Sequence, residues 1–151
     1  MSKMNEFVLA WMSHRNVLIQ LLEKMEDEQI NYKPWEDAMS LSELVLHISG
    51  SMDMFAKTVQ NGVFVPPTEV VTVQSIGELK EIVTSQTNET KTILEQLTPA
   101  QLDKHIEFAG MNLPGHALLN SAKDHEIHHK GQLFTYARLL GIDELPFFVS
   151  R

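Results

Sequence analysis

Apolar residues recur every three or four positions along four long stretches of the chain, which is the spacing of helices that bury one face. The first stretch covers residues 4–29. The second begins at Ser40, where Glu43 completes a capping box, and it ends at the Asn-Gly pair of residues 61–62. The pattern therefore predicts two long helices in the first half of the chain.

Two more long helices are predicted in the second half. Residues 75–97 carry the same apolar spacing. Pro114 precedes a further periodic segment, which closes at Gly141, a residue type that commonly ends helices. These two segments complete a set of four amphipathic helices.

The remaining segments are short. Thr98 and Gln101 form a capping box with a proline at the first helical position, which predicts a short helical turn. Residues 104–114 have no clear period and are expected to form a loop. The apolar tail, residues 145–149, is expected to pack back on the bundle or on a partner.

Four amphipathic segments without a convincing strand predict an all-α protein built as a four-helix bundle. Residues 63–73 are rich in β-branched side chains, but Pro66 and Pro67 make them a linker rather than a central strand. That linker is long enough for a crossover connection between the second and third helices. No internal repeat or low-complexity segment interrupts the chain, so one domain over residues 1–151 is expected.

Composition narrows the chemistry that the chain can support. It has 151 residues, 7 His and no Cys, which excludes a disulfide framework, an iron–sulfur cluster and a thiol nucleophile. Any transition metal must therefore be held by His and carboxylate side chains.

Charge and hydropathy exclude two classes of partner. Lys and Arg number 12 against 20 Asp and Glu, so the net charge of −8 argues against binding to nucleic acid. No apolar run reaches the roughly 18 residues of a membrane span, and the N-terminus lacks the features of a signal peptide. We therefore expect a cytoplasmic protein.

The fourth helix contains the run Asp-His-Glu-Ile-His-His, residues 124–129. His125 and His129 are four positions apart, so both imidazoles lie on one face and can reach one ion. At about 100° per residue both fall in the middle of the apolar stripe, and His128 lies to one side. Two buried imidazoles need partners for their polar nitrogens, and one metal ion bound by both would be such a partner. The alternative is a pair of ordinary core histidines with hydrogen-bond partners.

His47 on the second helix is the natural third ligand, because it lies at the rim of that helix's apolar face. Three protein ligands leave an open position for water or substrate, which is typical of catalytic rather than structural sites. His14 is in phase with the apolar residues of the first helix. It is either a core histidine or a residue near the site.

Two segments resemble the DinB-like family of bacterial metal-binding four-helix bundles. One is Ser-Leu-Ser-Glu-Leu-Val-Leu-His47-Ile, and the other is His125-Glu-Ile-His-His-Lys-Gly-Gln-Leu, followed by Tyr136-Ala-Arg-Leu-Leu-Gly. The helix order also matches, so the resemblance covers most of the chain. One departure is Lys130, where the family often has Arg, which keeps the charge but loses bidentate hydrogen bonding.

The resemblance implies one divalent ion, zinc or nickel, bound by His47, His125 and His129. Known members include transferases that use low-molecular-weight thiols, as well as related isomerases, and members commonly form homodimers. The family name refers to induction by DNA damage rather than to DNA binding, which agrees with the acidic net charge.

Three functions remain open. The first is a metal-dependent enzyme acting on a small molecule, either a hydrolase that uses bound water or a transferase that uses a thiol cofactor. The second is a non-catalytic metal-binding or stress-response protein. The third is a metallopeptidase, because residues 125–129 match H-E-x-x-H with Glu126 as general base. Against the third, no H-x-x-G-x-x-H completion follows, Glu144 is left as the acidic third ligand downstream, and no strand is expected to hold an extended peptide. Glu126 is more simply a solvated carboxylate.

Overall fold

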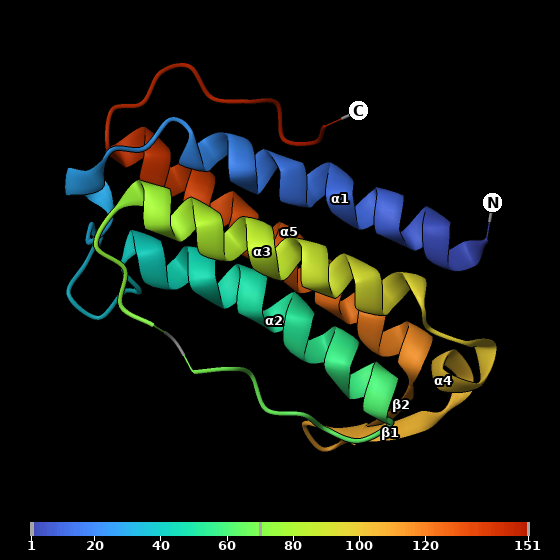
Figure 1. The fold of residues 1–151 in the computed structure, drawn as a ribbon. Coiled ribbons are helices and arrows are strands. Elements are labelled where there is room, and N and C mark those ends of the chain that lie inside the picture. Colours follow the sequence, from blue (N-terminus) through green and yellow to red (C-terminus); the bar gives the residue numbers. More distant parts are fainter. Residues whose placement is uncertain (1, 70, 151) are drawn as a thin grey trace.

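The computed structural model describes residues 2–69 and 71–150. Four long helices run side by side as a bundle (Figure 1). They are α1 (Lys3–Leu22), α2 (Leu41–Asn61), α3 (Ile76–Glu95) and α5 (Gly115–Leu139). The predicted four-helix bundle is confirmed.

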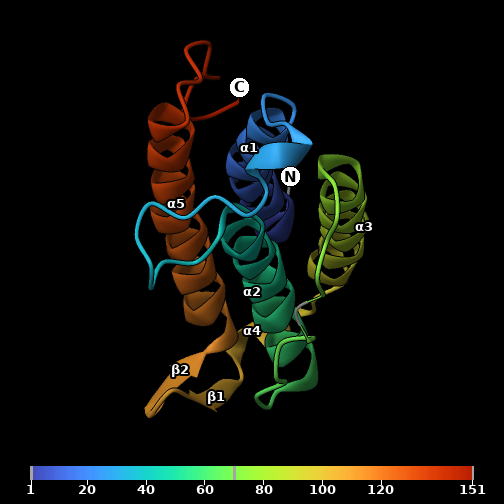
Figure 2. The ribbon, with the colours of Figure 1, turned by 90° about the vertical axis from the view of Figure 1, so that its left-hand side faces the viewer.

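The order of the helices in the bundle is not a simple up-and-down one. α1 and α2 each pack against both α3 and α5, and the four helices surround a shared interior (Figure 2). α2 and α3 run in the same direction, because the chain returns along the length of the bundle between them (Figure 1). The predicted crossover connection is therefore confirmed.

Most helix ends lie where the caps predict them. Ser40 and Glu43 form a reciprocal capping box at the start of α2, and Gly62 ends that helix with φ +73°. α1 is shorter than predicted, since it ends at Leu22 rather than at residue 29. Its last turn tightens through a hydrogen bond from the Met25 amide to the Leu22 carbonyl, which brings Met25 into the core. The 3₁₀-helix η1 (Asp27–Gln29) follows.

The segment between α3 and α5 is more ordered than expected. The predicted helical turn is α4 (Pro99–Asp103), with its Thr98 capping box. The expected loop at residues 104–114 is wrong: β1 (His105–Phe108) and β2 (Met111–Pro114) form an antiparallel hairpin. Ala109 and Gly110 connect the strands with φ +50° and +80°, as a type I′ turn requires. Alanine is not a usual residue in such a turn, so the sequence carried no signal for it.

The core consists of two apolar clusters, one toward each end of the bundle. The first includes Leu18, Leu22, Leu44, Ile48, Val83 and Leu133. The second includes Val8, Trp11, Met52, Leu94, Leu118 and Leu119. Between them every long helix contributes a buried polar side chain: Arg15, Ser49, Thr87 and Glu126. A polar layer therefore crosses the middle of the bundle.

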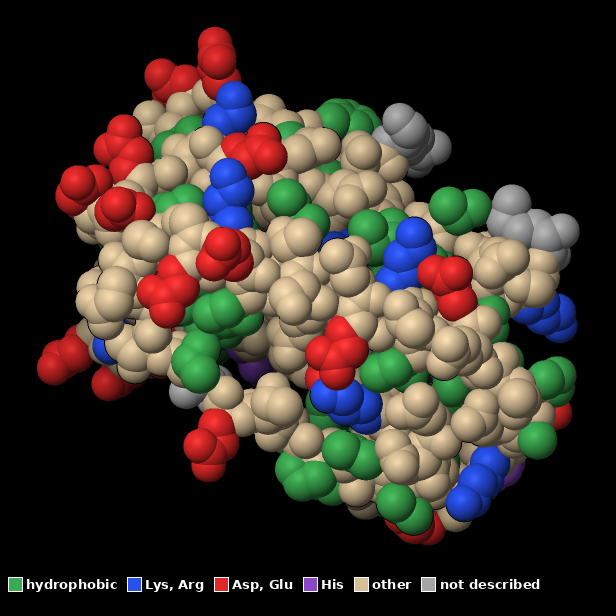
Figure 3. Space-filling view, in the orientation of Figure 1, with side chains coloured by type: hydrophobic (Ala, Val, Ile, Leu, Met, Phe, Trp, Pro, Cys, Tyr) green, Lys and Arg blue, Asp and Glu red, His purple; other side chains and the backbone are tan. Residues whose placement is uncertain are grey.

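The C-terminal tail packs back on the bundle, as predicted. Leu145 packs against the first apolar cluster, and the Ser150 amide donates to the Ser13 carbonyl at 2.8 Å. The tail returns along the bundle from the end of α5 (Figure 1). None of the described helices is both long and apolar enough to cross a membrane. On the face shown in Figure 3, Lys and Arg side chains are scattered among acidic ones rather than gathered into a patch.

Candidate metal centre

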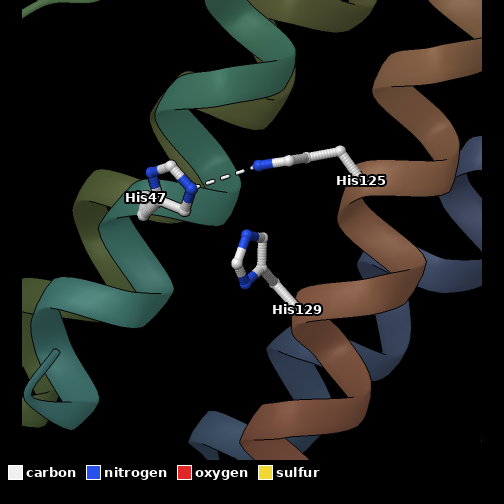
Figure 4. A group of neighbouring side chains, drawn as sticks. All are labelled: His47, His125 and His129. Atoms are coloured by element: carbon white, nitrogen blue, oxygen red, sulfur yellow. Dashed lines mark hydrogen bonds between the residues drawn. The ribbon is translucent and has the colours of Figure 1, made fainter. Parts of the chain in front are cut away.

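Three histidines from two helices meet between α2 and α5. His47 lies on α2, and His125 and His129 lie one turn apart on α5 (Figure 4). Each offers a ring nitrogen, and these nitrogens all lie within 4.8 Å of one another. The structure therefore brings together the three residues that the sequence selected as ligands.

The packing of α5 against α2 explains why the three rings converge. The i, i+4 spacing places His125 and His129 on one face of α5, and that face lies toward α2. Their ring centroids are 4.4 Å apart, and the His47 ring lies 4.9 Å from His125 and 4.7 Å from His129. All three side chains are half-buried, at the level of the polar layer.

The spacing of the nitrogens fits a shared ion. His47 Nε2 and His125 Nε2 are 3.1 Å apart. Two imidazole nitrogens bound at about 2.0–2.1 Å to a tetrahedral ion are separated by about 3.4 Å, so only a small adjustment is needed. Three imidazoles suit zinc, nickel, copper or iron rather than the hard cations calcium and magnesium.

Electrostatics keep the rings in the form that binds metal. Burial, together with the neighbouring His129, His47 and His128, lowers the pKa of His125 from 6.5 to about 4. Burial and His129 also lower the pKa of His47. Both imidazoles are therefore neutral at pH 7, which is the form that binds a metal ion.

One neighbour of the site was not found from the sequence. The Oε1 atom of Gln132 lies 2.7 Å from Nδ1 of His129. The two residues are three positions apart on α5, so the i, i+3 rule would have placed them together. His128 is exposed, and although its ring lies 4.7 Å from that of His129, it is not part of the group of three.

The prediction that His125 and His129 occupy the centre of the buried stripe is wrong. That centre holds Glu126, 1% exposed, and Lys130, 3% exposed. Turning by about 100° per residue, the helix places the histidines beside this stripe, on the side of α2. The core of α5 therefore contains two charged side chains, which require partners.

Glu126 finds its partners on α1. It accepts hydrogen bonds from Arg15 Nε at 2.9 Å, from Arg15 Nη2 at 2.6 Å and from Trp11 Nε1 at 2.9 Å. The expectation of a solvated carboxylate is therefore wrong. Both carboxylate oxygens are bound by α1 side chains, which argues against the general-base role that H-E-x-x-H suggests.

Lys130 and His14 form a second contact between α1 and α5. Lys130 Nζ donates to Nδ1 of His14 at 2.8 Å and also to the Phe148 carbonyl of the tail. Burial lowers the pKa of Lys130, while nearby Glu126 opposes this shift. Burial and Lys130 lower the pKa of His14. His14 is thus a hydrogen-bonded histidine of the helix interface and lies outside the group of three.

Comparison with known proteins agrees with this fold. The sequence pattern of the DinB family matches residues 1–150. This chain belongs to the DinB family. One relative is YjoA of Bacillus subtilis (strain 168). It is 41% identical to this chain over 154 residues, and the alignment covers 100% of this chain and 99% of YjoA.

Solved structures of DinB-like proteins share the bundle. The crystal structure of YjoA superimposes with a TM-score of 0.85 at 42% identity, covering 97% of this chain and 99% of that one. A DinB-like protein from Bacillus cereus ATCC 10987 gives a TM-score of 0.78 at 18% identity, covering 93% and 94% of the two chains. YfiT of Bacillus subtilis gives 0.73 at 14% identity, covering 95% and 91%, and is described as "a probable metal-dependent hydrolase with an unusual four-helix bundle topology".

Proposed function

We propose that this DinB-family protein is a metal-dependent hydrolase that acts on a small molecule, with one divalent ion held by His47, His125 and His129. The observation that carries the proposal is the convergence of three imidazoles, whose nitrogens lie within 4.8 Å of one another. The description of YfiT as "a probable metal-dependent hydrolase" supports the choice of reaction class.

The donor set suits catalysis. Three neutral ligands keep the full charge of the ion and leave a position open, so a bound zinc or nickel ion would supply Lewis-acid chemistry toward water and toward a substrate oxygen. Glu126 adds no negative charge to the ligand set, because it pairs with Arg15 of α1 in the core. The chain's own contribution is to hold the three rings in place and, by burial, to lower the pKa of His47 and His125.

Metal content tests the ligand set. Untagged protein is expressed with both zinc and nickel in the medium and purified without a metal column. Inductively coupled plasma mass spectrometry is expected to find one divalent ion per chain. His125→Ala should lose that ion. His128→Ala is the matched control, because His128 lies on the same helix but outside the group of three, and it should keep the ion. Full metal content in folded His125→Ala would end the proposal.

Turnover tests the reaction class. Metal-loaded protein, chelated protein and His125→Ala are compared on a panel of small esters, amides and phosphoesters, with and without low-molecular-weight thiols. The expected result is hydrolysis that requires the metal and does not require a thiol. Turnover only with a thiol would make the protein a transferase, and that thiol must come with a cofactor because the chain has no Cys. Metal binding without turnover, with a fourth protein ligand, would indicate a sensor or store.

We also propose a homodimer in solution, as the family resemblance implies. Exposed apolar side chains on α1, α5 and the tail offer surface that a second copy could cover: Leu9, Leu139, Phe147 and Phe148. Light scattering on the purified protein measures the mass directly, and a monomer at micromolar concentration would contradict this expectation.

A further inference from the structure

We propose that Gln132 is a positioning residue for the metal centre: its side-chain carbonyl holds the ring proton of His129 on Nδ1 and so leaves Nε2 free for the ion. The inference rests on the proposed function only in that the three histidines bind a metal. Gln132 lies outside the ligand set, and the property at issue is the tautomer of His129 in the metal-free protein.

The contact itself fixes where the proton lies. Gln132 Oε1 is 2.7 Å from His129 Nδ1, a distance typical of a strong N–H···O bond. A carbonyl oxygen only accepts hydrogen bonds, and a neutral imidazole has one N–H group. With Oε1 as the acceptor, the proton lies on Nδ1 and Nε2 carries the lone pair.

The free lone pair points into the site. One ring nitrogen of His129 faces the nitrogens of His47 and His125 (Figure 4). The other is the one that Gln132 holds. The hydrogen bond and the metal thus use opposite sides of the same ring, as in the second-shell arrangements that orient metal-binding histidines.

The energetic benefit follows from the tautomer preference of imidazole. In water a neutral histidine side chain favours the proton on Nε2, which is the atom that must lose it in order to bind the ion. Gln132 stabilises the other tautomer in the metal-free protein, so part of the cost of binding is removed beforehand. It also restricts rotation of the ring about χ2.

Gln132 is singular in this role. Among residues 2–69 and 71–150, Gln132 is the one residue outside the group of three histidines whose side chain hydrogen-bonds to one of their ring nitrogens. His47 and His125 contact each other through their Nε2 atoms at 3.1 Å. Loss of Gln132 should therefore be felt at His129 first.

The test measures zinc affinity and the His129 tautomer in the same variants. Gln132→Leu removes the acceptor, Gln132→Glu keeps it, and Thr135→Leu is a control at another exposed position on α5. Zinc affinity is measured by competition with a chromophoric chelator. The tautomer is read from the ¹⁵N shifts of the His129 ring in the chelated protein, and circular dichroism verifies the fold of each variant.

The expected result is a Gln132→Leu protein that stays folded, shifts toward the Nε2–H tautomer and binds zinc about tenfold more weakly, the lower end of second-shell effects because Gln132 is exposed. Gln132→Glu should keep the Nδ1–H tautomer and bind zinc at least as tightly as the wild type. Thr135→Leu should change neither.

An unchanged tautomer and zinc affinity in Gln132→Leu would overturn the inference. So would an Nε2–H tautomer in the wild type, which would mean that the Gln132 amide group donates instead. Both results leave the proposed function standing as long as His125→Ala still loses its metal. If His125→Ala keeps the metal, the ligand set itself is wrong, so the two failures are distinguishable.

Discussion

Arg15 of α1 and Glu126 of α5 form a buried salt bridge, with Nη2 and Oε1 separated by 2.6 Å and side chains that are 0% and 2% exposed. Arg15 Nη1 also donates to Thr87 of α3 at 2.8 Å, so the pair ties three helices together. Because Glu126 follows His125 directly in the chain, fixing Glu126 against α1 also fixes the direction in which His125 leaves α5. The salt bridge therefore links the polar layer to the three histidines.

We expect Arg15→Met to destabilise the protein by about 3–5 kcal/mol, because it leaves the Glu126 charge buried without its partner. The double variant Arg15→Met, Glu126→Leu should recover most of that loss, since apolar side chains can replace a buried ion pair at little cost. Urea unfolding of the wild type, the single variant and the double variant measures this. A double variant as unstable as Arg15→Met would show that the loss comes from packing rather than from the stranded charge.

Metal binding should stabilise the folded protein. A ligand that binds only the native state adds about 2.7 kcal/mol at one hundred times its Kd, so zinc should raise the Tm of chelated wild-type protein. His125→Ala should show no such rise, whereas His128→Ala should respond like the wild type. Differential scanning calorimetry at several zinc concentrations tests this, and an equal zinc response in all three proteins would place the metal elsewhere.

The stability of the metal-free protein should fall as the pH is lowered from 6.5 toward 4. The pKa of His125 is 6.5 ordinarily and about 4 in the folded protein. Between these values the unfolded chain binds a proton that the folded chain does not, so protonation favours unfolding. Other groups titrate in this range, so the informative quantity is the difference from His125→Asn. Urea midpoints of that variant should fall less between pH 7 and pH 4.5, and equal falls would contradict the lowered pKa.

Two glycines of α5 should respond in opposite directions to alanine. A Cβ at Gly115 would lie 2.7 Å from the Gln101 carbonyl oxygen and 2.8 Å from Val59 Cγ1, so Gly115→Ala should cost about 1–3 kcal/mol through overpacking. A Cβ at Gly131 meets nothing within 4 Å, so Gly131→Ala should add about 0.5–1 kcal/mol of helix stability. Urea unfolding compares the two, and a stabilising Gly115→Ala would mean that α4 moves freely away from α5.

Local signals in the sequence were sufficient for the helices. The capping boxes at Ser40 and Thr98 act through hydrogen bonds within four residues, and Gly62 acts through its own φ. Such interactions depend on no distant part of the chain, so their outcome can be read without the fold. The end of α1 could not be predicted from local signals, because the turn after Leu22 goes with the packing of Met25 into the core.

The sequence also determined which residues can meet at the metal centre, because the i, i+4 spacing of His125 and His129 is a property of the helix itself. It could not determine how α5 is rotated. Two neighbouring stripes of α5 both follow steps of three and four residues. One contains Leu118, Ala122, His125, His129 and Leu133, and the other contains Leu119, Ala122, Glu126, Lys130 and Leu133.

Only the tertiary structure decided between these stripes. Glu126 can occupy the core because Arg15, 111 positions away, neutralises its charge and satisfies its oxygens. Lys130 can do so because His14 and the tail accept its hydrogen bonds. The histidines then lie at the α2 side, half-buried and open to an ion. Hydrophobic periodicity records which faces avoid water, whereas the pairing of buried charges depends on residues that only the fold brings together.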